Sequence, residues 1–391
     1  MEEKEIGLYI HMPFCKQKCL YCDFVSYANK YGEADRYIKC LKREIVQYAN
    51  ENRIMHEHGL EPKYIIKTIY IGGGTPSSIE EGYILSVIKT IKENFAVEED
   101  AEITIEVNPG TVNKEKLEVY KQCGINRLSI GLQAVQDNLL KSIGRIHTFK
   151  DFENTYDYAR QVGFDNINVD LMIALPGQTM DDVKESVKTI VGLKPEHISV
   201  YSLILEEGTP MYDMVQNKKL ELPDDDTERQ MYWYVKECLE KHKYKHYEIS
   251  NFARPGFESK HNMDCWDQKE YIGVGTAASS FMENKRYSNT DDLETYMENI
   301  EAVNMNKNLV LDEVLMDDDE RMDEFMMLGL RKIDGVNIRE FEQRFNVNPI
   351  MRYCKTLDKL NSEGLIEVDA DCIRLSSKGI DLANVVWEEF V

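Results

Sequence analysis

The feature that most limits what this chain can fold into is an alternation that repeats from residue 7 to about residue 207. Six short apolar, β-branched runs occupy residues 8–10, 68–71, 103–107, 127–130, 166–172 and 197–204. The segments between them carry apolar residues at steps of three and four, as at Ile38, Leu41, Ile45 and Tyr48, which predicts amphipathic helices. Six strand–helix units in succession predict an α/β fold with a parallel sheet and helices outside it, either a barrel or an open part of one.

Polar and glycine-rich segments follow these runs, where each strand should end. In βα barrels the carboxyl ends of the strands form the functional face, so we expect these segments to converge on one mouth. Glycines there would let the backbone approach a ligand closely, because a Cβ atom would clash. The segments span residues 15–22, 72–76, 106–110, 131–133 and 170–177.

The first of these segments is the most specific, because it holds three cysteines in eight residues, Cys15, Cys19 and Cys22. Thiolates this close together can bind zinc or an iron–sulfur cluster. A cuboidal 4Fe-4S cluster is usually held by four cysteines, but the residue two places after Cys22 is Phe24. The loop therefore predicts a cluster with one iron left open to a ligand that the protein does not supply, which indicates a reactive centre.

Two alternatives use the same thiols. A structural zinc site would close with His11 as its fourth ligand, because zinc sites of the Cys3His type are common. A disulfide framework fits less well, since the chain has nine cysteines, an odd number, with no signal peptide and no apolar run long enough to span a membrane. These features predict a protein of the reducing cytoplasm.

The spacing C-x3-C-x2-C after an N-terminal strand, followed by Gly-Gly-Gly-Thr-Pro at residues 72–76, resembles the signature of the radical S-adenosylmethionine (SAM) superfamily. In that superfamily the open iron of a 4Fe-4S cluster chelates SAM, which the cluster cleaves to a 5′-deoxyadenosyl radical. The resemblance implies that Cys15, Cys19 and Cys22 hold this cluster. It implies SAM contacts for Tyr9, Tyr21, Gly73, Gly74, Thr75, Glu106, Gln133, Arg145 and Asp170.

The charged members of this set have suitable chemistry. Glu106 and Asp170 can accept hydrogen bonds from ribose hydroxyls or an amine, and Arg145 can hold a carboxylate. Each also has an ordinary structural explanation, as a helix cap, an ion-pair partner or a surface charge. Glu106 is the strongest candidate, because a carboxylate that ends an apolar strand is costly unless it has a partner.

A second candidate site follows the end of the alternation. Residues 223–226 are typical of a helix start or a linker, and residues 228–242 of a helix. Beyond them lies the sequence His-Asn-Met-Asp-Cys-Trp at residues 261–266. Imidazole and thiolate are both axial ligands of heme iron, and an aromatic ring can cover a macrocycle. His261 and Cys265 are therefore candidate heme ligands, although a histidine in a loop more often has a structural role.

The last part of the chain, from about residue 304, predicts a winged-helix module. An acidic run precedes three helical patterns, and residues 364–368 and 372–375 can pair as a hairpin. Winged helices often bind DNA, but residues 301–391 contain 11 basic and 20 acidic side chains, a net charge of −9, and the whole chain carries −23. Such surfaces repel phosphate backbones and anionic lipids, so we expect neither nucleic acid nor bare membrane as a partner.

Over nearly its full length the chain resembles the HemN/HemW branch of radical SAM proteins, through the cysteine loop, residues 72–76, Ile-Glu-Val-Asn-Pro-Gly at 105–110, Leu-Pro-Gly-Gln at 175–178 and the acidic tail. HemN-type enzymes are oxygen-independent coproporphyrinogen III dehydrogenases, whereas HemW-type proteins bind heme and pass it to apo-heme proteins. HemN-type loops carry a fourth cysteine where Phe24 stands. HemW-type proteins carry His-Asn-x-x-Tyr-Trp, which residues 261–266 match except that Cys265 replaces tyrosine. The short segment before the first strand also resembles the HemW type.

The resemblance implies a heme chaperone with a SAM-bound 4Fe-4S cluster, and it leaves oxygen-independent coproporphyrinogen III dehydrogenation as the enzymatic alternative. The implied cofactors are the cluster, SAM and heme. The implied partners are apo-heme proteins and an electron donor such as a flavodoxin or ferredoxin, with membranes reached only through acceptor proteins. We expect a partial radical SAM (β/α)6 barrel at residues 1–220, an extension with the heme motif at 221–303, and an acidic winged-helix-like α+β domain at 304–391.

Overall fold

The computed structural model describes residues 3–302 and 310–391, and its central element is a sheet in which the strands of the six predicted strand–helix units run parallel. Their order in the sheet is also their order in the chain. Each strand contains one of the predicted apolar runs or most of it, so the α/β class and the parallel sheet are confirmed. The six strands are β1 (Glu3–Met12), β4 (Lys63–Gly73), β5 (Ala96–Val107), β6 (Arg127–Gln133), β7 (Ile167–Ile173) and β8 (His197–Ser202).

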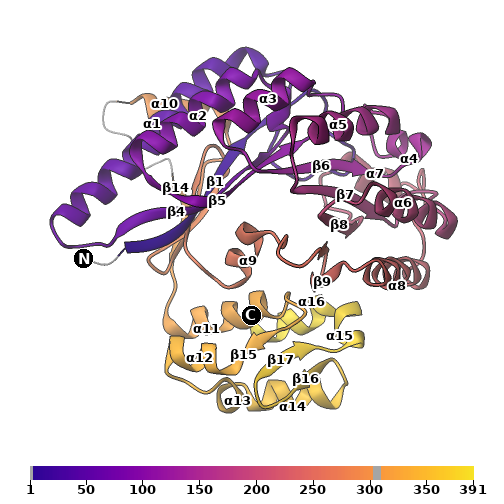
Figure 1. Ribbon diagram of the computed structural model, residues 1–391. Coiled ribbons are helices and arrows are strands. Elements are labelled where there is room, and N and C mark those ends of the chain that lie inside the picture. The colour runs from indigo at the N-terminus through magenta and orange to yellow at the C-terminus, as the bar shows by residue number, and fades with distance from the viewer. Residues whose placement is uncertain (1–2, 303–309) are drawn as a thin grey trace.

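Five long helices lie along the outer face of this sheet, as Figure 1 shows. They are α1 (Ala34–Glu57), α2 (Glu81–Asn94), α3 (Lys114–Cys123), α5 (Phe149–Val162) and α6 (Met180–Leu193). Two of them begin with a capping box, in which Thr148 or Thr179 satisfies backbone N–H groups that the first turn leaves unpaired. The apolar stripe predicted for the first helix is buried in the common core, with Leu41 and Ile45 fully buried.

Strands from the middle of the chain extend the sheet at both sides. On one side, β10 (Asn251–Ala253) and β9 (Lys245–Glu248) add antiparallel to β8. On the other side, β11 (Tyr271–Val274) pairs parallel with β1. It is followed by β12 (Ser279–Met282), β13 (Lys285–Asn289) and β14 (Val310–Leu315). In the part of the chain that the structure describes, β9 and β14 are the edges of an open sheet, so the predicted partial barrel is confirmed.

The C-terminal part forms a module with its own hydrophobic core. Its main helices are α11 (Asp318–Gly329), α12 (Ile338–Phe345) and α14 (Cys354–Ser362). The predicted hairpin is β16 (Ile366–Val368) paired antiparallel with β17 (Cys372–Leu375), and β15 (Val336–Asn337) adds a third strand. Three helices with a small antiparallel sheet confirm the winged-helix-like α+β prediction. The expected boundary at residues 303 and 304 lies outside the described residues.

Shorter elements connect these parts. They are β2 (Phe14–Cys15), β3 (Tyr27–Ala28), α4 (Asp137–Ser142), α7 (Pro210–Gln216), α9 (Lys260–Trp266), α10 (Leu293–Glu301), α13 (Pro349–Arg352), α15 (Ser377–Asp381) and α16 (Ala383–Trp387). A further long helix, α8 (Asp225–Lys241), packs against α6. In Figure 1, α9 lies between the sheet and the C-terminal module. None of the described helices combines the length and apolar composition that crossing a bilayer requires.

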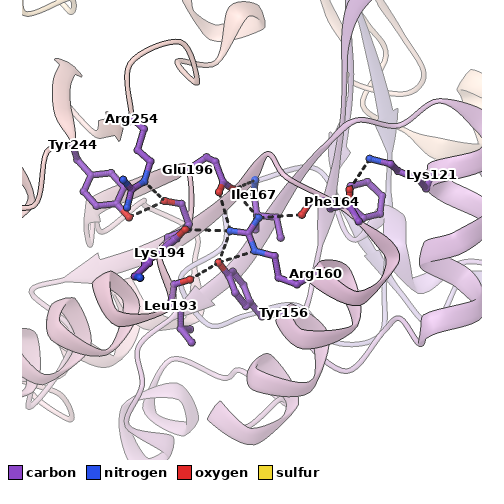
Figure 2. Close-up of polar contacts among 12 residues, drawn as sticks. Lys121, Tyr156, Arg160, Phe164, Ile167, Leu193, Lys194, Glu196, Tyr244 and Arg254 are labelled. Carbon is purple, nitrogen blue, oxygen red and sulfur yellow. Dashed lines mark hydrogen bonds and ion pairs between the residues drawn. The ribbon is translucent and has the colours of Figure 1, made fainter.

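A polar cluster outside the barrel interior anchors the turn that leads into β8, as Figure 2 shows. Arg160 of α5 forms an ion pair with Glu196 at 2.9 Å and donates to the Tyr156 hydroxyl at 2.6 Å. Glu196 also accepts from the backbone N–H of Ile167 at 3.0 Å, where β7 begins. This cluster fixes the amino ends of β7 and β8. It therefore also fixes the position along the barrel axis of the side chains at their carboxyl ends.

Candidate active site at the strand ends

A cavity of about 480 Å³ lies at the carboxyl ends of the parallel strands. It brings together most of the residues that the sequence predicts for the cluster and for SAM. The predicted residues that line it are Cys15, Cys19, Tyr21, Cys22, Gly73, Gly74, Thr75, Glu106, Gln133, Arg145 and Asp170. Tyr9, His261 and Cys265 lie away from its lining. Segments from six different strand ends thus meet at one mouth, as the sequence predicts.

The glycine turn after β4 packs directly against the cysteine loop. The Gly74 N–H donates to the Met12 carbonyl at 2.8 Å, and the Thr75 N–H donates to the Phe14 carbonyl at 2.8 Å. A Cβ atom on Gly74 would lie 3.0 Å from the Cys15 sulfur and 2.9 Å from the Phe14 oxygen, so only glycine fits this approach. The turn therefore fixes where the loop starts.

The far side of the cysteine loop is held by two other segments. The Leu20 N–H donates to the Ile143 carbonyl at 3.1 Å, and the Leu20 carbonyl accepts from Met211 of α7 at 2.9 Å. All nine cysteines of the chain are free thiols. Among residues 3–302 and 310–391, no three His, Cys, Asp or Glu side chains are already drawn into one metal-ion cage. The three loop thiols share a cavity wall, and thiolates of a cuboidal cluster need not converge on a point because each binds a different iron.

His11, the fourth ligand of the zinc alternative, has protein partners at both ring nitrogens. Its Nε2 donates to the Val25 carbonyl at 2.8 Å, because a carbonyl can only accept. Its Nδ1 accepts from the Tyr9 hydroxyl at 3.1 Å. Burial lowers the pKa of His11, which favours this neutral form. A zinc site that used His11 would have to break one of these hydrogen bonds.

Glu106 ends β5 inside the cavity. Its carboxyl group accepts from the Tyr70 hydroxyl at 3.0 Å and from the Gly73 N–H at 3.2 Å. Burial raises the pKa of Glu106 to about 7, and these two hydrogen bonds oppose the rise. A carboxyl group poised in this way can accept hydrogen bonds from a cationic or hydroxyl-bearing ligand near neutral pH.

Arg145 and Asp170 supply opposite charges to the same cavity. Arg145 Nη1 donates to the Asn108 side chain at 3.0 Å, and among the described residues its buried Nε has no hydrogen-bond partner. Asp170 accepts from Asn168 at 2.6 Å, and burial raises the pKa of Asp170. An unpartnered guanidinium N–H beside two carboxylates and three free thiols fits a cluster that carries SAM, whose amino acid end is zwitterionic.

The cavity also has lining residues that the sequence analysis did not select. Tyr201 and Met172 lie side by side in the pairing of β8 with β7, and Ile204 and Phe24 line the cavity with their side chains 67% and 70% exposed. Asn108 belongs to a predicted strand-end segment but was not named as a site residue. Tyr70 could have been found from its spacing, because it precedes Gly72 by two positions and therefore faces the same side of the strand.

The predicted heme motif lies on α9, at the opposite end of the same sheet face. The His261 ring stacks on Tyr70, with centroids 5.3 Å apart, and its Nδ1 lies 2.8 Å from the Thr68 hydroxyl. Burial lowers the pKa of His261 to about 4 and raises the pKa of Cys265 to about 12, so the imidazole is neutral and the thiol protonated at pH 7. Tyr9 also stacks on Tyr70, with their ring centroids 6.3 Å apart.

Comparison with protein families matches two models to this chain. Residues 9–190 match the radical SAM superfamily, and residues 316–382 match the HemN C-terminal domain. Among solved structures, coproporphyrinogen III oxidase (HemN) from Escherichia coli, described as a radical SAM enzyme, superposes with a TM-score of 0.83 at 24% identity, over 100% of this chain and 90% of that one. That likeness shows the fold.

Curated relatives are similar over the whole chain. "Heme chaperone HemW" from Lactococcus lactis is 36% identical over 391 residues, covering 100% of this chain and 98% of the relative. The protein of the same name from Bacillus subtilis is 36% identical, covering 98% of each chain. A zebrafish protein named "Radical S-adenosyl methionine domain-containing protein 1, mitochondrial" is 29% identical over 98% of this chain and 86% of its own. The chain belongs to the HemW heme chaperone family of the radical SAM superfamily.

Proposed function

We propose that this protein is a heme chaperone, which binds heme and transfers it to apo-heme proteins. The observation that carries the proposal is the similarity to proteins named heme chaperone HemW, at 36% identity from one end of the chain to the other. Similarity over the full length includes the strand-end cavity, α9 and the C-terminal module, so it extends to every part with a proposed role.

The cavity is proposed to hold a 4Fe-4S cluster and SAM. Cys15, Cys19 and Cys22 would bind three irons, and the bound group supplies one-electron chemistry that protein side chains lack. The chain's own part is to position ligands. Glu106 and Asp170 accept hydrogen bonds, and the free Nε–H of Arg145 donates one.

Heme is proposed to dock at α9, with His261 as an iron ligand. The neutral imidazole required for iron coordination is the form that burial enforces here. His261 is only 7% exposed, far less than a ligand to a broad porphyrin ring needs, so coordination requires α9 to move. Cys265 lies on the same helix and is a second candidate ligand.

The remaining partners follow from this role. We propose apo-heme proteins as acceptors, a flavodoxin or ferredoxin as electron donor, and a cytoplasmic location with membranes reached only through acceptors. The enzymatic alternative, coproporphyrinogen III dehydrogenation, has the fold shared with HemN as its support, at 24% identity. Phe24 in place of a fourth cysteine weighs against it.

Hemin titration of the anaerobically reconstituted protein tests the chaperone proposal. We expect saturable one-to-one binding in the Soret region, weakened roughly tenfold or more by His261→Ala, as for other losses at metal sites. The matched control is His246→Ala on β9, where burial also lowers the histidine pKa to about 4. Weak hemin binding that is equal in all three proteins would contradict the proposal and direct attention to SAM cleavage with coproporphyrinogen III.

A further inference from the structure

Helix α9 lies at the amino-terminal end of the barrel interior and the SAM cavity at the carboxyl-terminal end. Glu102, near the start of the buried part of β5, accepts from the backbone N–H groups of Lys260 and His261 at 3.1 and 3.2 Å. Glu106 stands four positions further along the same strand and faces the cavity. The two candidate sites are therefore separated by the length of one strand segment, with buried side chains between them.

A continuous chain of hydrogen bonds, which we name the polar row, joins the first turn of α9 to the cavity. The Ser259 N–H donates to the Tyr247 hydroxyl at 3.3 Å, which lies 2.7 Å from His197 Nε2. His197 Nδ1 lies 2.6 Å from the Asn168 side-chain oxygen, and the Asn168 amide donates to Asp170 at 2.6 Å. The first four residues of the row are at most 3% exposed, so water does not compete with these bonds.

The polar row has one consistent direction of donation. The Asn168 oxygen can only accept, so His197 Nδ1 carries the proton, and a neutral His197 then accepts at Nε2 from Tyr247. Burial holds the pKa of His197 well below its usual range, which keeps it neutral. The Asn168 amide also donates to Ser129 at 2.8 Å, which fixes its orientation. A break at α9 removes the donor to Tyr247 and so weakens the later bonds, because hydrogen bonds in a chain polarise one another, while Ser129 and Ser199 keep Asn168 in place.

A second connection, the aromatic row, runs beside the first. His261 stacks on Tyr70, and the Tyr70 hydroxyl donates to Glu106 at 3.0 Å. Thr68, two positions before Tyr70 on β4, forms a hydrogen bond with His261 Nδ1 through its hydroxyl group. The stacked His261 ring restricts the rotamers of Tyr70. The position of His261 therefore also determines the geometry of the hydrogen bond from the Tyr70 hydroxyl to Glu106.

We propose that these two rows couple the ends of the barrel, so that heme at His261 weakens SAM binding in the cavity and SAM holds α9 in place. This inference rests on the proposed function. Heme coordination withdraws His261 from Tyr70 and Ser259 from Tyr247, which weakens the hydrogen bonds that Glu106 receives from Tyr70 and Asp170 receives from Asn168. By thermodynamic linkage, SAM bound to the two fixed carboxylates lowers the affinity for heme by the same factor.

The direct test measures the Kd for SAM of the cluster-reconstituted protein, with and without saturating hemin. We expect hemin to raise this Kd about fivefold or more, within the usual range of coupling between sites. Tyr70→Phe keeps the ring and removes the hydroxyl that Glu106 uses, and Tyr247→Phe breaks the polar row. Each should reduce the coupling in part, and the double variant should leave the Kd within about twofold of its value without hemin.

The matched control is Tyr64→Phe, on the same strand as Tyr70. Its hydroxyl donates to Glu61 at 2.9 Å, away from both sites, so full coupling should remain. A measurement on the native protein does not depend on any variant folding. SAM alone should slow hydrogen exchange at the backbone amides of residues 260–266.

Each outcome separates the two proposals. If hemin and SAM both bind but neither changes the affinity for the other, the coupling is wrong and the chaperone proposal stands. If coupling persists in the double variant, or if SAM does not slow hydrogen exchange at the α9 amides, the coupling does not pass through the two rows. If the native protein does not bind hemin at all, the chaperone proposal fails, and this inference fails with it.

Discussion

Two glutamates on β5 face the same interior and have opposite tasks. Glu102 is committed to the structure, because its oxygens accept from two backbone N–H groups at the start of α9. Glu106 faces the cavity, where burial raises its pKa to about 7 and where its carboxyl group can accept hydrogen bonds from a ligand. The comparison teaches that one strand can carry a structural anchor near its middle and a group that faces the cavity at its carboxyl end.

The largest effect is expected for a substitution at the cavity end of the barrel, where it should abolish iron binding. Cys19→Ser removes one of the three thiolates proposed to hold the cluster, which have no fourth beside them in the loop, so iron after reconstitution should fall to background. The free energy of unfolding of the iron-free chain should change little, because Cys19 is only partly buried. Iron analysis and chemical denaturation measure the two quantities.

The control for this prediction is Cys354→Ser, because Cys354 is exposed on α14. It should bind iron as the native chain does. Normal iron in the Cys19→Ser protein would show that the cluster is not held by the loop.

A smaller effect, a loss of stability, is expected for a substitution at the α9 end of the barrel. Glu102→Leu leaves the N–H groups of Lys260 and His261 without their acceptor, which should cost about 2–4 kcal/mol of unfolding free energy. Iron content should stay at the native level. The exposed Glu99 on the same strand gives the control variant Glu99→Leu, which should be nearly neutral. Equal losses in both variants would mean that Glu102 does not anchor α9.

The smallest effect is a change in the pH dependence of stability. Glu106 has a pKa of about 7 when folded, above its ordinary value of 4.5, so the folded state binds the extra proton between these values. Its contribution to stability is therefore present below pH 4.5 and lost as the pH rises towards 7. Glu106→Gln should remove a decline of about 1–3 kcal/mol over this window, as measured by denaturation at several pH values.

For His261, at the α9 end, the pH dependence of stability has the opposite sign. His261 has a pKa of about 4 when folded, below its ordinary 6.5, so its contribution is lost as the pH falls from 6.5 to 4. Glu106→Gln should leave this acid limb in place. Glu248, with a pKa also raised to about 7 by burial, continues to contribute a decline in the neutral range. An unchanged neutral slope in Glu106→Gln would mean that its carboxyl group is as easily ionised when folded as when unfolded.

The sequence predicted those parts of the molecule that depend on local pattern. The six parallel strands follow from apolar runs of the right length, and their polar ends had to meet because parallel strands end at one edge. Cys15, Glu106 and Asp170 were therefore predicted to come together from separate strand ends, as they do. The hairpin of the C-terminal module was predicted for the same reason, from two short runs around a polar turn.

The rest depends on pairing between distant residues, which no local pattern encodes. Strand β11 pairs with β1, more than 250 residues earlier in the chain, and no pattern in the sequence between them predicts this pairing. The start of α9 is held by Glu102, a charged residue on β5 that no sequence motif distinguishes from other acidic residues. The spacing of Tyr70 to Gly72 could have placed it on the cavity side of β4, but its contacts with His261 and Glu106 join residues that are far apart in the chain.

The measurement that tests the chaperone account most directly is heme transfer as a function of acceptor concentration. The hemin-loaded protein is mixed with a b-type apocytochrome, and the Soret spectrum of the product is followed. A chaperone passes heme within a complex, so the account predicts a transfer rate that rises with acceptor concentration before it saturates. A rate that is the same at every acceptor concentration would mean that heme is simply released into solution, and would contradict the account.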